Sequence, residues 1–222
     1  AITVYAASMR IILIRHFKTQ TNKDGRILGW GDSPPCEDWR VDFDFVDALL
    51  TEQGVNFDAV YSSDLERSRQ TAKLHARVLG ISTVDSSAEL NEVNYGKLQQ
   101  KRKSWVGDNY PKHKKDPDMV YPGGESFRQM QQRSVRFLSS LVEANPKQSA
   151  LVVAHAGVIR GLISHFLGLE YADNLERRIP FRYIGDFLFK GKHCVRYKEL
   201  GRPSGFVRDR IIKIPFKPGS AS

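Results

Sequence analysis

Residues 10–16 read RIILIRH, a short aliphatic run that ends on an arginine and a histidine. The run is too short for a helix and is typical of a strand that is buried on both faces of a sheet. Residues 57–61, FDAVY, and residues 150–154, ALVVA, have the same character. Because helical patterns separate these runs, the sequence predicts strands that alternate with helices.

Three segments have apolar residues at helical spacing, namely 64–79, 125–142 and 157–167. The first is preceded by Ser63, and Glu66 follows three residues later, which predicts a capping box at its start. Residues 183–189 and 193–198 predict late strands, antiparallel at an edge of the sheet. The order of elements indicates an α/β fold with a mainly parallel central sheet flanked by helices.

The 222 residues suit one sizeable domain, which we expect to span residues 9–217. Residues 96–124 interrupt the pattern, since they are polar, basic and contain three prolines. We interpret this segment as a lid-like excursion over the sheet. Residues 1–8, ahead of Met9, and residues 218–222 are expected to be tails or expression remnants.

Membrane and disulfide classes of protein are not indicated. No apolar run approaches the ~20 residues that a membrane-spanning helix needs, so no membrane partner is expected. Cys36 and Cys194 lie far apart and outside any CxxC pattern, which suggests neither a zinc site nor a disulfide framework. Two such thiols fit a cytoplasmic location. No metal and no cofactor are expected.

Reactive side chains follow three of the predicted strands. Arg15 and His16 end the first strand, Ser62 and Ser63 follow the second, with Arg67 one helical turn further on, and His155 follows the third. Open α/β sheets bind ligands at the carboxyl ends of their strands. If these strands are parallel, two arginines and two histidines therefore meet at one rim.

Such a rim suits phosphoryl transfer. Arginine forks match the geometry of a phosphate and keep their charge, and a helix that starts at Ser63 would add free backbone N–H groups. A neutral histidine beside them can attack phosphorus and carry the phosphoryl group on nitrogen. The fixed cations then stabilise the charge of the transition state without a magnesium ion. An arginine and histidine after a strand are, taken alone, more often without function.

Six further stretches make the ordered set more specific. They are RHFKT at 15–19 with Asn22, RILGWGDSP at 26–34, SSDLERSRQTA at 62–72, LNEVNYG at 90–96, PGGES at 122–126, and VVAHAG at 152–157. Together they span about residues 9–170 and resemble, in the same order, the motifs of the histidine phosphatase (phosphoglycerate mutase-like) superfamily. This resemblance implies the three-layer fold of that superfamily.

The resemblance also implies roles for individual residues. His16 is expected to be the nucleophile, Glu92 the general acid and then the general base, and the remaining catalytic residues are Arg15, Arg67 and His155. Without the resemblance, Glu92 reads as a solvated loop carboxylate. The residues expected to bind substrate are Asn22, Lys18, Arg26, Gly29 and Ala156.

Two departures from the family pattern concern the substrate. Phe17 replaces the usual glycine and is expected to narrow the pocket or to shape its mouth, and Lys18 adds charge at the rim. Val93 stands where the mutases tend to have arginine, and only about thirty residues separate Glu92 from the PGGES stretch. These features favour a phosphatase, with phosphoglycerate mutase-type phosphotransfer as the alternative.

The formal net charge is +9, and the excess gathers around 97–115 and in the last forty residues. A basic field attracts anions, so a small and multiply anionic phosphorylated substrate is expected. The second alternative is a non-catalytic protein that binds phosphate or nucleic acid. No nucleic-acid partner is expected, because the chain has no helix-turn-helix signature and no aromatic-basic interleaving. A homodimer is left open as the assembly state.

Overall fold

The computed structural model describes residues 8–200, without the side chain of Lys114. The expected tails, apart from Ser8, and the expected boundary at residue 217 lie outside the described residues. The strands are β1 (Ser8–Arg15), β2 (Ala59–Ser63), β3 (Val84–Ser87), β4 (Ser149–Ala154), β5 (Ile184–Lys190) and β6 (His193–Leu200). The α-helices are α1 (Gln20–Lys23), α2 (Trp39–Glu52), α3 (Glu66–Val78), α4 (Lys103–Asn109), α5 (Phe127–Ala144), α6 (Ala156–Phe166) and α7 (Tyr171–Asn174). Three short 3₁₀ turns are η1 (Ala88–Leu90), η2 (Gly96–Leu98) and η3 (Pro111–Lys114).

The strands form one six-stranded sheet in the order β3-β2-β4-β1-β5-β6. β4 lies between β1 and β2 and is parallel to both, and β3 is parallel to β2. β5 runs antiparallel to β1, and β6 runs antiparallel to β5. The predicted mainly parallel sheet with late antiparallel strands is therefore confirmed.

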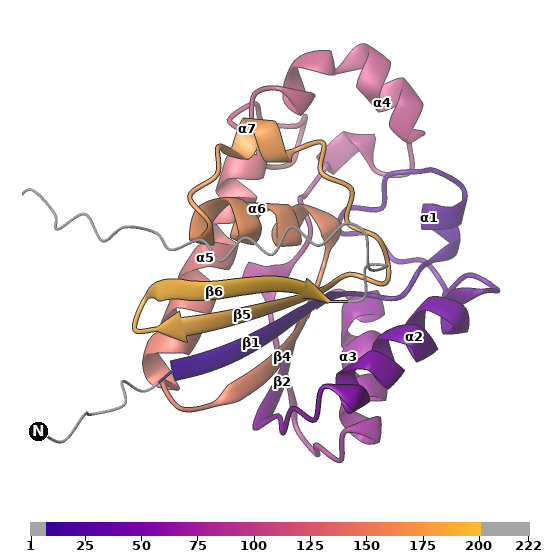
Figure 1. Ribbon diagram of the computed structural model, residues 1–222. Helices are drawn as coiled ribbons and strands as arrows, with labels where there is room; N and C mark the ends of the chain where they lie inside the picture. Colours follow the sequence, from indigo (N-terminus) through magenta and orange to yellow (C-terminus); the bar gives the residue numbers. More distant parts are fainter. Residues whose placement is uncertain (1–7, 201–222) are drawn as a thin grey trace, which may run out of the picture.

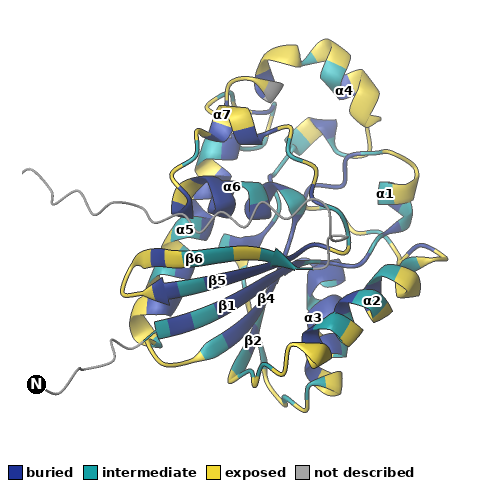
Figure 2. Cartoon of the chain, viewed as in Figure 1, coloured by how far each residue is buried: buried dark blue, intermediate teal, exposed yellow. Residues whose placement is uncertain are grey.

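Helices cover both faces of this sheet, as Figure 1 shows. Alternate residues of β1 separate two cores: Ile11 and Leu13 pack with residues of α5 and α6, whereas Ile12 and Ile14 pack with residues of α2 and α3. All four side chains are fully buried. The dark interior strands and the exposed outer surfaces of the helices in Figure 2 show the same three-layer arrangement. The aliphatic run at 10–15 thus forms a strand because only a doubly covered strand buries every one of its side chains.

The predicted elements lie close to the observed ones. β2 begins at Ala59 and extends through Ser63, two residues beyond the predicted end. The predicted capping box is wrong: α3 begins at Glu66, its N-cap Leu65 makes no side-chain cap bond, and the Ser63 hydroxyl accepts the N–H of Leu65 instead. Two elements were not predicted, the 14-residue helix α2 and the short edge strand β3.

Residues 96–124 contain α4 and two 3₁₀ turns and lie at the top of the molecule in Figure 1. Tyr121 and Val106 anchor this excursion in the core that α5 and α6 also share. The backbone N–H of Lys103 donates to the carbonyl of Gly25, so the excursion is also held against the loop after α1. Among the described residues, none of the helices has both the length and the apolar character needed to span a membrane.

Candidate functional site

The carboxyl ends of the central strands bring the predicted residues together. Arg15 at the end of β1 is in register with Ala154 at the end of β4, and the N–H of His16 donates to the Ala154 carbonyl at 3.0 Å. His155 follows directly, so the rings of His16 and His155 lie 5.0 Å apart, centroid to centroid. The two histidines are adjacent because their strands are parallel neighbours, although 139 positions separate them in the chain.

His16 is held in one tautomer. Its Nδ1 lies 2.6 Å from the carbonyl oxygen of Phe17, an acceptor, so Nδ1 carries the hydrogen and Nε2 keeps its lone pair. The ring is buried. Burial, followed by the positive charges of Arg67 and Arg15, lowers the pKa of His16 well below its ordinary value of 6.5. A buried neutral imidazole with a free Nε2 is the form that can attack phosphorus.

His155 is oriented by a residue of β2. The Nε2 of His155 lies 2.6 Å from the Ser63 hydroxyl, and both side chains are fully buried. Burial and the charge of Arg67 lower the pKa of His155 well below 6.5, so this ring is also neutral. If the Ser63 hydroxyl donates to Nε2, the Nδ1 of His155 carries the hydrogen and can donate it to an anion.

Arg15 and Arg67 have fixed positions. Arg67 donates from its two terminal nitrogens to the carbonyls of Gly31 at 2.9 Å and Gly29 at 2.7 Å. Arg15 donates to the carbonyl of Ile179 at 2.5 Å and lies over the ring of Phe181. Burial lowers the pKa of Arg15 to about 9 and that of Arg67 to about 10, so both remain charged at neutral pH.

Three buried donors of this site have no partner among the described residues. They are the Nε atoms of Arg15 and Arg67 and the Nδ1 of His155. A buried donor without a partner costs about 1–3 kcal/mol, and such groups are rare in folded proteins. The three residues lie near His16, since the charges of Arg67 and Arg15 act on its ring and the ring of His155 packs against it, so together they suit an anion with several acceptor oxygens.

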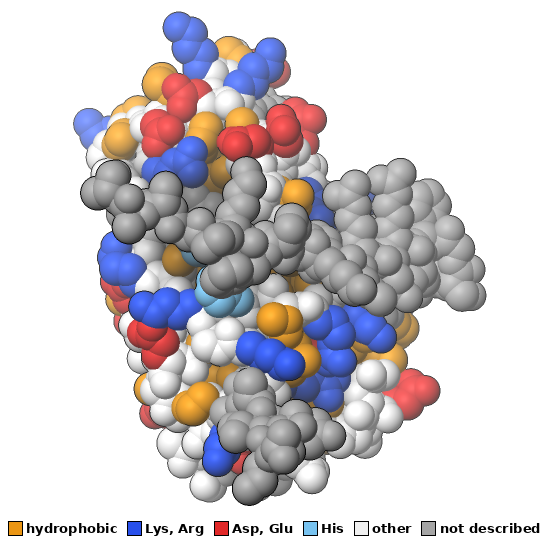
Figure 3. Space-filling view, turned by 60° about the vertical axis from the view of Figure 1, so that its left-hand side comes forward, with side chains coloured by type: hydrophobic (Ala, Val, Ile, Leu, Met, Phe, Trp, Pro, Cys, Tyr) orange, Lys and Arg blue, Asp and Glu red, His pale blue; other side chains and the backbone are white. Residues whose placement is uncertain are grey.

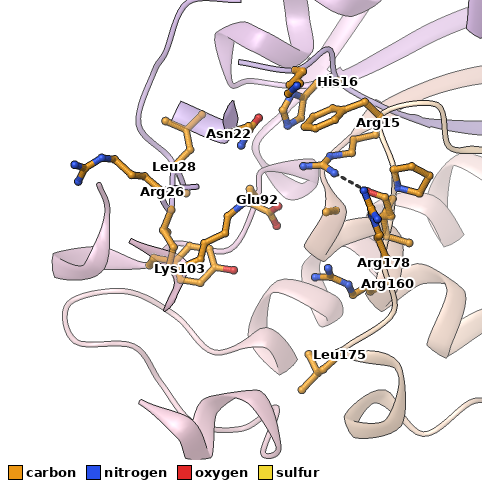
Figure 4. A pocket seen from close by; sticks show the side chains of 18 of the residues that line it. Arg15, His16, Asn22, Arg26, Leu28, Glu92, Lys103, Arg160, Leu175 and Arg178 are labelled. Atoms are coloured by element: carbon orange, nitrogen blue, oxygen red, sulfur yellow. Dashed lines mark hydrogen bonds between the residues drawn. The ribbon is translucent and has the colours of Figure 1, made fainter. Parts of the chain in front are cut away.

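Glu92 reaches the same rim from the loop after η1. Its Oε2 accepts the N–H of Gly157 at 3.2 Å, and its Oε1 accepts the N–H of Val93 at 3.0 Å. A Cβ at Gly157 would lie 2.2 Å from Oε1, so only glycine leaves room for the carboxylate here. The first turn of α6 therefore positions Glu92, and Figure 4 shows Glu92 across the hollow from Arg15.

These residues line a cavity of about 710 Å³. Nine of the ten predicted site residues line it, whereas His155 does not and packs against His16, with the ring centroids 5.0 Å apart. Aromatic side chains from three segments also line the cavity, namely Tyr95, Tyr110, Tyr121 and Phe127. The cavity thus combines a polar phosphate-sized end with an apolar wall, which is the general character of small-molecule sites.

The predicted substrate-binding residues differ in what they contact. The Oδ1 of Asn22 accepts the backbone N–H of Thr19 at 3.3 Å, which closes a capping box on α1. Lys18 forms an ion pair with Asp38 at 3.3 Å, and Arg26 donates to the carbonyl of Gln100 at 2.8 Å. The backbone of Gly29 holds Arg67, as described above, and Ala156 is the first residue of α6.

One expectation about the rim is wrong. Phe17 does not line the cavity: it is buried and its ring packs against Trp39 at 5.2 Å. Of the basic residues at 97–115 whose side chains are described, only Lys103 lines the cavity, while Lys101 lies over the ring of Trp105. The apolar ring of Phe17 is buried in the core, whereas the other lysines of the excursion with described side chains are exposed to solvent.

Sequence reasoning missed the residues between α7 and β5 and one residue of α6. Arg178, Ile179 and Phe181 reach the cavity because β5 is antiparallel and therefore begins at the rim where β1 and β4 end. Arg160 reaches it from the second turn of α6. The only signal in the sequence was the pair of arginines at 177–178, which stands in no motif.

The described residues hold no group of three or more His, Cys, Asp or Glu side chains that is arranged to bind a metal ion.

On the face drawn in Figure 3, basic side chains lie among acidic and apolar ones over the upper part of the molecule. The positive charge of the site comes from the six arginines and two lysines that line the cavity itself.

Comparison with known proteins agrees with this geometry. Residues 11–184 match the model of the family described as the histidine phosphatase superfamily (branch 1). The adenosylcobalamin/α-ribazole phosphatase of Escherichia coli (strain K12) is 34% identical over 168 residues, which cover 72% of this chain and 80% of that protein. A 2,3-bisphosphoglycerate-dependent phosphoglycerate mutase of Bartonella tribocorum is 29% identical over 186 residues, which cover 78% of this chain and 90% of that protein.

Solved structures share the fold. The crystal structure of a putative α-ribazole-5'-P phosphatase from Escherichia coli is 30% identical, with a TM-score of 0.72, over 86% of this chain and 94% of that one. A structure described as mycobacterial hydrolase 1 has a TM-score of 0.74 at 22% identity, over 87% of this chain and 97% of that one, which is a likeness of fold.

Proposed function

The chain belongs to the histidine phosphatase superfamily, and we propose that it is a phosphomonoester hydrolase that works through a phosphohistidine at His16 without a metal ion. The observation that carries the proposal is the convergence of three unpartnered buried donors, from Arg15, Arg67 and His155, beside a neutral imidazole. A phosphoryl group supplies the acceptor oxygens that these donors lack.

In the first step, Nε2 of His16 forms a bond to phosphorus while the bond between phosphorus and the ester oxygen breaks. The protonated carboxyl of Glu92 gives its proton to the leaving oxygen, and an alcohol departs. Arg15, Arg67 and the Nδ1–H of His155 stabilise the charge on the transferred phosphoryl oxygens.

In the second step, the Glu92 carboxylate takes a proton from water, and the water oxygen forms a bond to phosphorus. The phosphorus–nitrogen bond then breaks, which releases inorganic phosphate and restores His16. Fixed arginines take the electrostatic part that a magnesium ion has in other phosphoryl transfers, so the proposed reaction needs no metal.

The substrate is proposed to be a small phosphate ester that carries more than one anionic group. Eight basic side chains line the cavity, against three acidic ones. The basic residues are Arg15, Lys18, Arg26, Arg67, Lys103, Arg160, Arg178 and Arg182. The similarity to an α-ribazole phosphatase supports hydrolysis of a phosphate ester, although the phosphatase and mutase relatives are similarly distant.

Phosphoglycerate mutase-type transfer is the second candidate, and similarity to the Bartonella tribocorum enzyme favours it. Val93, at the position where the family resemblance places an arginine in mutases, is fully buried in the core and cannot contact a substrate. This position therefore favours transfer of the phosphoryl group to water.

The test is hydrolysis of phenyl phosphate in EDTA from about pH 5 to 8 by wild type, His16→Ala and His193→Gln. We expect turnover in wild type and in His193→Gln, whose histidine is exposed on β6, and none in His16→Ala. Phosphoenzyme trapped during turnover should be labile to acid, as phosphohistidine is. Full activity in His16→Ala would overturn the proposal, and transfer to a phosphoglycerate in preference to water would favour the mutase.

A further inference from the structure

Two arginines of the cavity stand apart from the cradle around His16. Arg160 comes from α6 and Arg178 from the segment between α7 and β5, and Figure 4 shows both on the Arg15 side of the hollow, with Lys103 and Arg26 on the opposite side. Arg160 lies in the second turn of the helix that follows β4, and Arg178 precedes the antiparallel strand β5. Neither residue was among the predicted site residues.

The charges of Arg160 and Arg178 are not neutralised by the protein. Neither takes part in any ion pair among the described residues. Arg160 is nevertheless fixed, because its Nε donates to the carbonyl of Arg177 at 2.6 Å, which leaves its two terminal nitrogens for a ligand. Arg178 makes no side-chain hydrogen bond to the described residues and is exposed to the cavity and solvent.

Holding these cations near Arg15 has an electrostatic cost. Burial lowers the pKa of Arg15, the charge of Glu92 opposes this, and the charges of Arg160, Arg67 and Arg178 lower the pKa further. Like charges that are gathered in one cavity repel one another unless an anion binds between them. Arg15, Arg67 and His155 already provide hydrogen-bond donors for one phosphoryl group. The two arginines without an ion pair are therefore available to bind a second anionic group.

We propose that Arg160 and Arg178 form a second anion subsite, which binds a carboxylate or a second phosphate on the body of the phosphate ester. The proposal rests on the proposed function, because it places the transferred phosphoryl group at His16. Arg160 and Arg178 supply planar forks that match a carboxylate or phosphate in bidentate geometry.

The surroundings of the subsite define the rest of the substrate. Leu175, which Figure 4 shows below Arg160, lines the cavity, and so does Ile179, whose carbonyl accepts from Arg15. The rings of Tyr95, Tyr121 and Phe127 also line the cavity. The substrate class is therefore a small phosphate ester whose body has an apolar or planar face and carries its second anionic group away from the ester bond.

A pair of matched probes tests this subsite. Phenyl phosphate and 3-carboxyphenyl phosphate differ by one meta carboxylate, which hardly alters the leaving phenol, and benzene-1,3-diyl bisphosphate supplies a second phosphate instead. We expect wild type to prefer one of the two diacids over phenyl phosphate by about 10-fold or more in kcat/KM. Whichever diacid is preferred identifies the second group as carboxylate or phosphate.

The preference should disappear when the arginines are neutralised. In Arg178→Met, and separately in Arg160→Met, the ratio of kcat/KM for the preferred diacid to that for phenyl phosphate should fall toward one. Arg77→Met is the matched control, because Arg77 is exposed on α3 and does not line the cavity. Arg178→Met is informative even if Arg160→Met is unstable, since Arg178 makes no hydrogen bond that the fold needs.

Binding in the His16→Ala background separates the two proposals. There, calorimetry with each of the two diacids reports the subsite without turnover, and adding Arg178→Met should weaken binding of the tighter-binding diacid about 10-fold or more. A loss of affinity without wild-type turnover would overturn only the proposed hydrolysis. Turnover that depends on His16, with a ratio that Arg160→Met and Arg178→Met leave unchanged, would overturn only the subsite.

Discussion

A Cβ on Gly157 would lie 2.2 Å from the Oε1 of Glu92, so the first turn of α6 and the carboxylate occupy adjoining space. The far end of a glutamate can swing aside at little cost to the fold, whereas its position relative to the ester oxygen would be lost. We therefore expect Gly157→Ala to behave as a loss of the general acid rather than as a loss of stability.

For an alkyl phosphate, Gly157→Ala and Glu92→Gln should each lower kcat by about 100-fold or more. For 4-nitrophenyl phosphate, whose leaving group needs no proton, both decreases should be much smaller. Gly161→Ala in the same helix is the control, because a Cβ there meets Gln131 at 3.3 Å and not Glu92. Equal losses on both substrates would contradict a role of Glu92 in protonating the leaving oxygen.

Arg67 donates hydrogen bonds to two backbone carbonyls, which predicts that a positive charge alone is not sufficient for catalysis at this position. Arg67→Lys keeps a cation but cannot hold the carbonyls of Gly29 and Gly31 and a phosphate together. We expect kcat/KM for phenyl phosphate to fall by about 100-fold or more. Arg69→Lys, whose guanidinium pairs with Glu66 at 2.5 Å on the surface, should remain close to wild type. Wild-type activity in Arg67→Lys would show that the planar fork is not required.

Ser63 is predicted to be a positioning residue, since it contacts His155 and not the substrate. Ser63→Ala should lower kcat by about 3- to 10-fold with little change in KM, because the ring loses the bond at Nε2 that holds its Nδ1 toward the site. Ser62→Ala removes a buried hydroxyl that bonds only the backbone carbonyl of Ser63. It therefore controls for the stability cost, and an equal effect of both variants on kcat would argue against orientation of His155.

The low pKa of His16 and of His155 predicts that acid destabilises the fold. The unfolded histidines take up protons below about pH 6.5, whereas the buried neutral rings do not, so the free energy of unfolding falls as the pH falls from about 6.5 toward the folded-state pKa. Each histidine contributes at most about 1.4 kcal/mol per pH unit. Urea unfolding without phosphate at pH 7.5, 6 and 5 measures this slope.

His16→Asn should make that slope shallower, because one of the two buried titrations is removed. His193→Gln should keep the wild-type slope, since its histidine is exposed. Identical slopes in wild type and in His16→Asn would mean that His16 takes up its proton equally in the folded and unfolded states.

Local sequence pattern was sufficient for the elements that lead to the phosphate end of the site. The short aliphatic runs at 10–15 and 150–154 bury all their apolar side chains only as strands covered on both faces of a sheet. The residues that follow parallel strands then lie at one rim of the sheet. His16, Arg15 and His155 could therefore be placed together from the sequence. The resemblance to the family added Glu92, which no periodicity indicates.

The tertiary structure alone decided the direction of side chains and the far side of the cavity. Phe17 turns into the core against Trp39, because burial of an aromatic ring outweighs its proximity to the rim in the chain. Arg178 reaches the cavity because β5 runs antiparallel to β1 and brings residues 175–183 back to the rim, whereas Arg160 reaches it from the second turn of α6. The sequence by itself determined the strand ends and their reactive residues, because local pattern is sufficient for these. The tertiary structure determined which other charged side chains line the cavity, because strand direction and packing depend on contacts between distant segments.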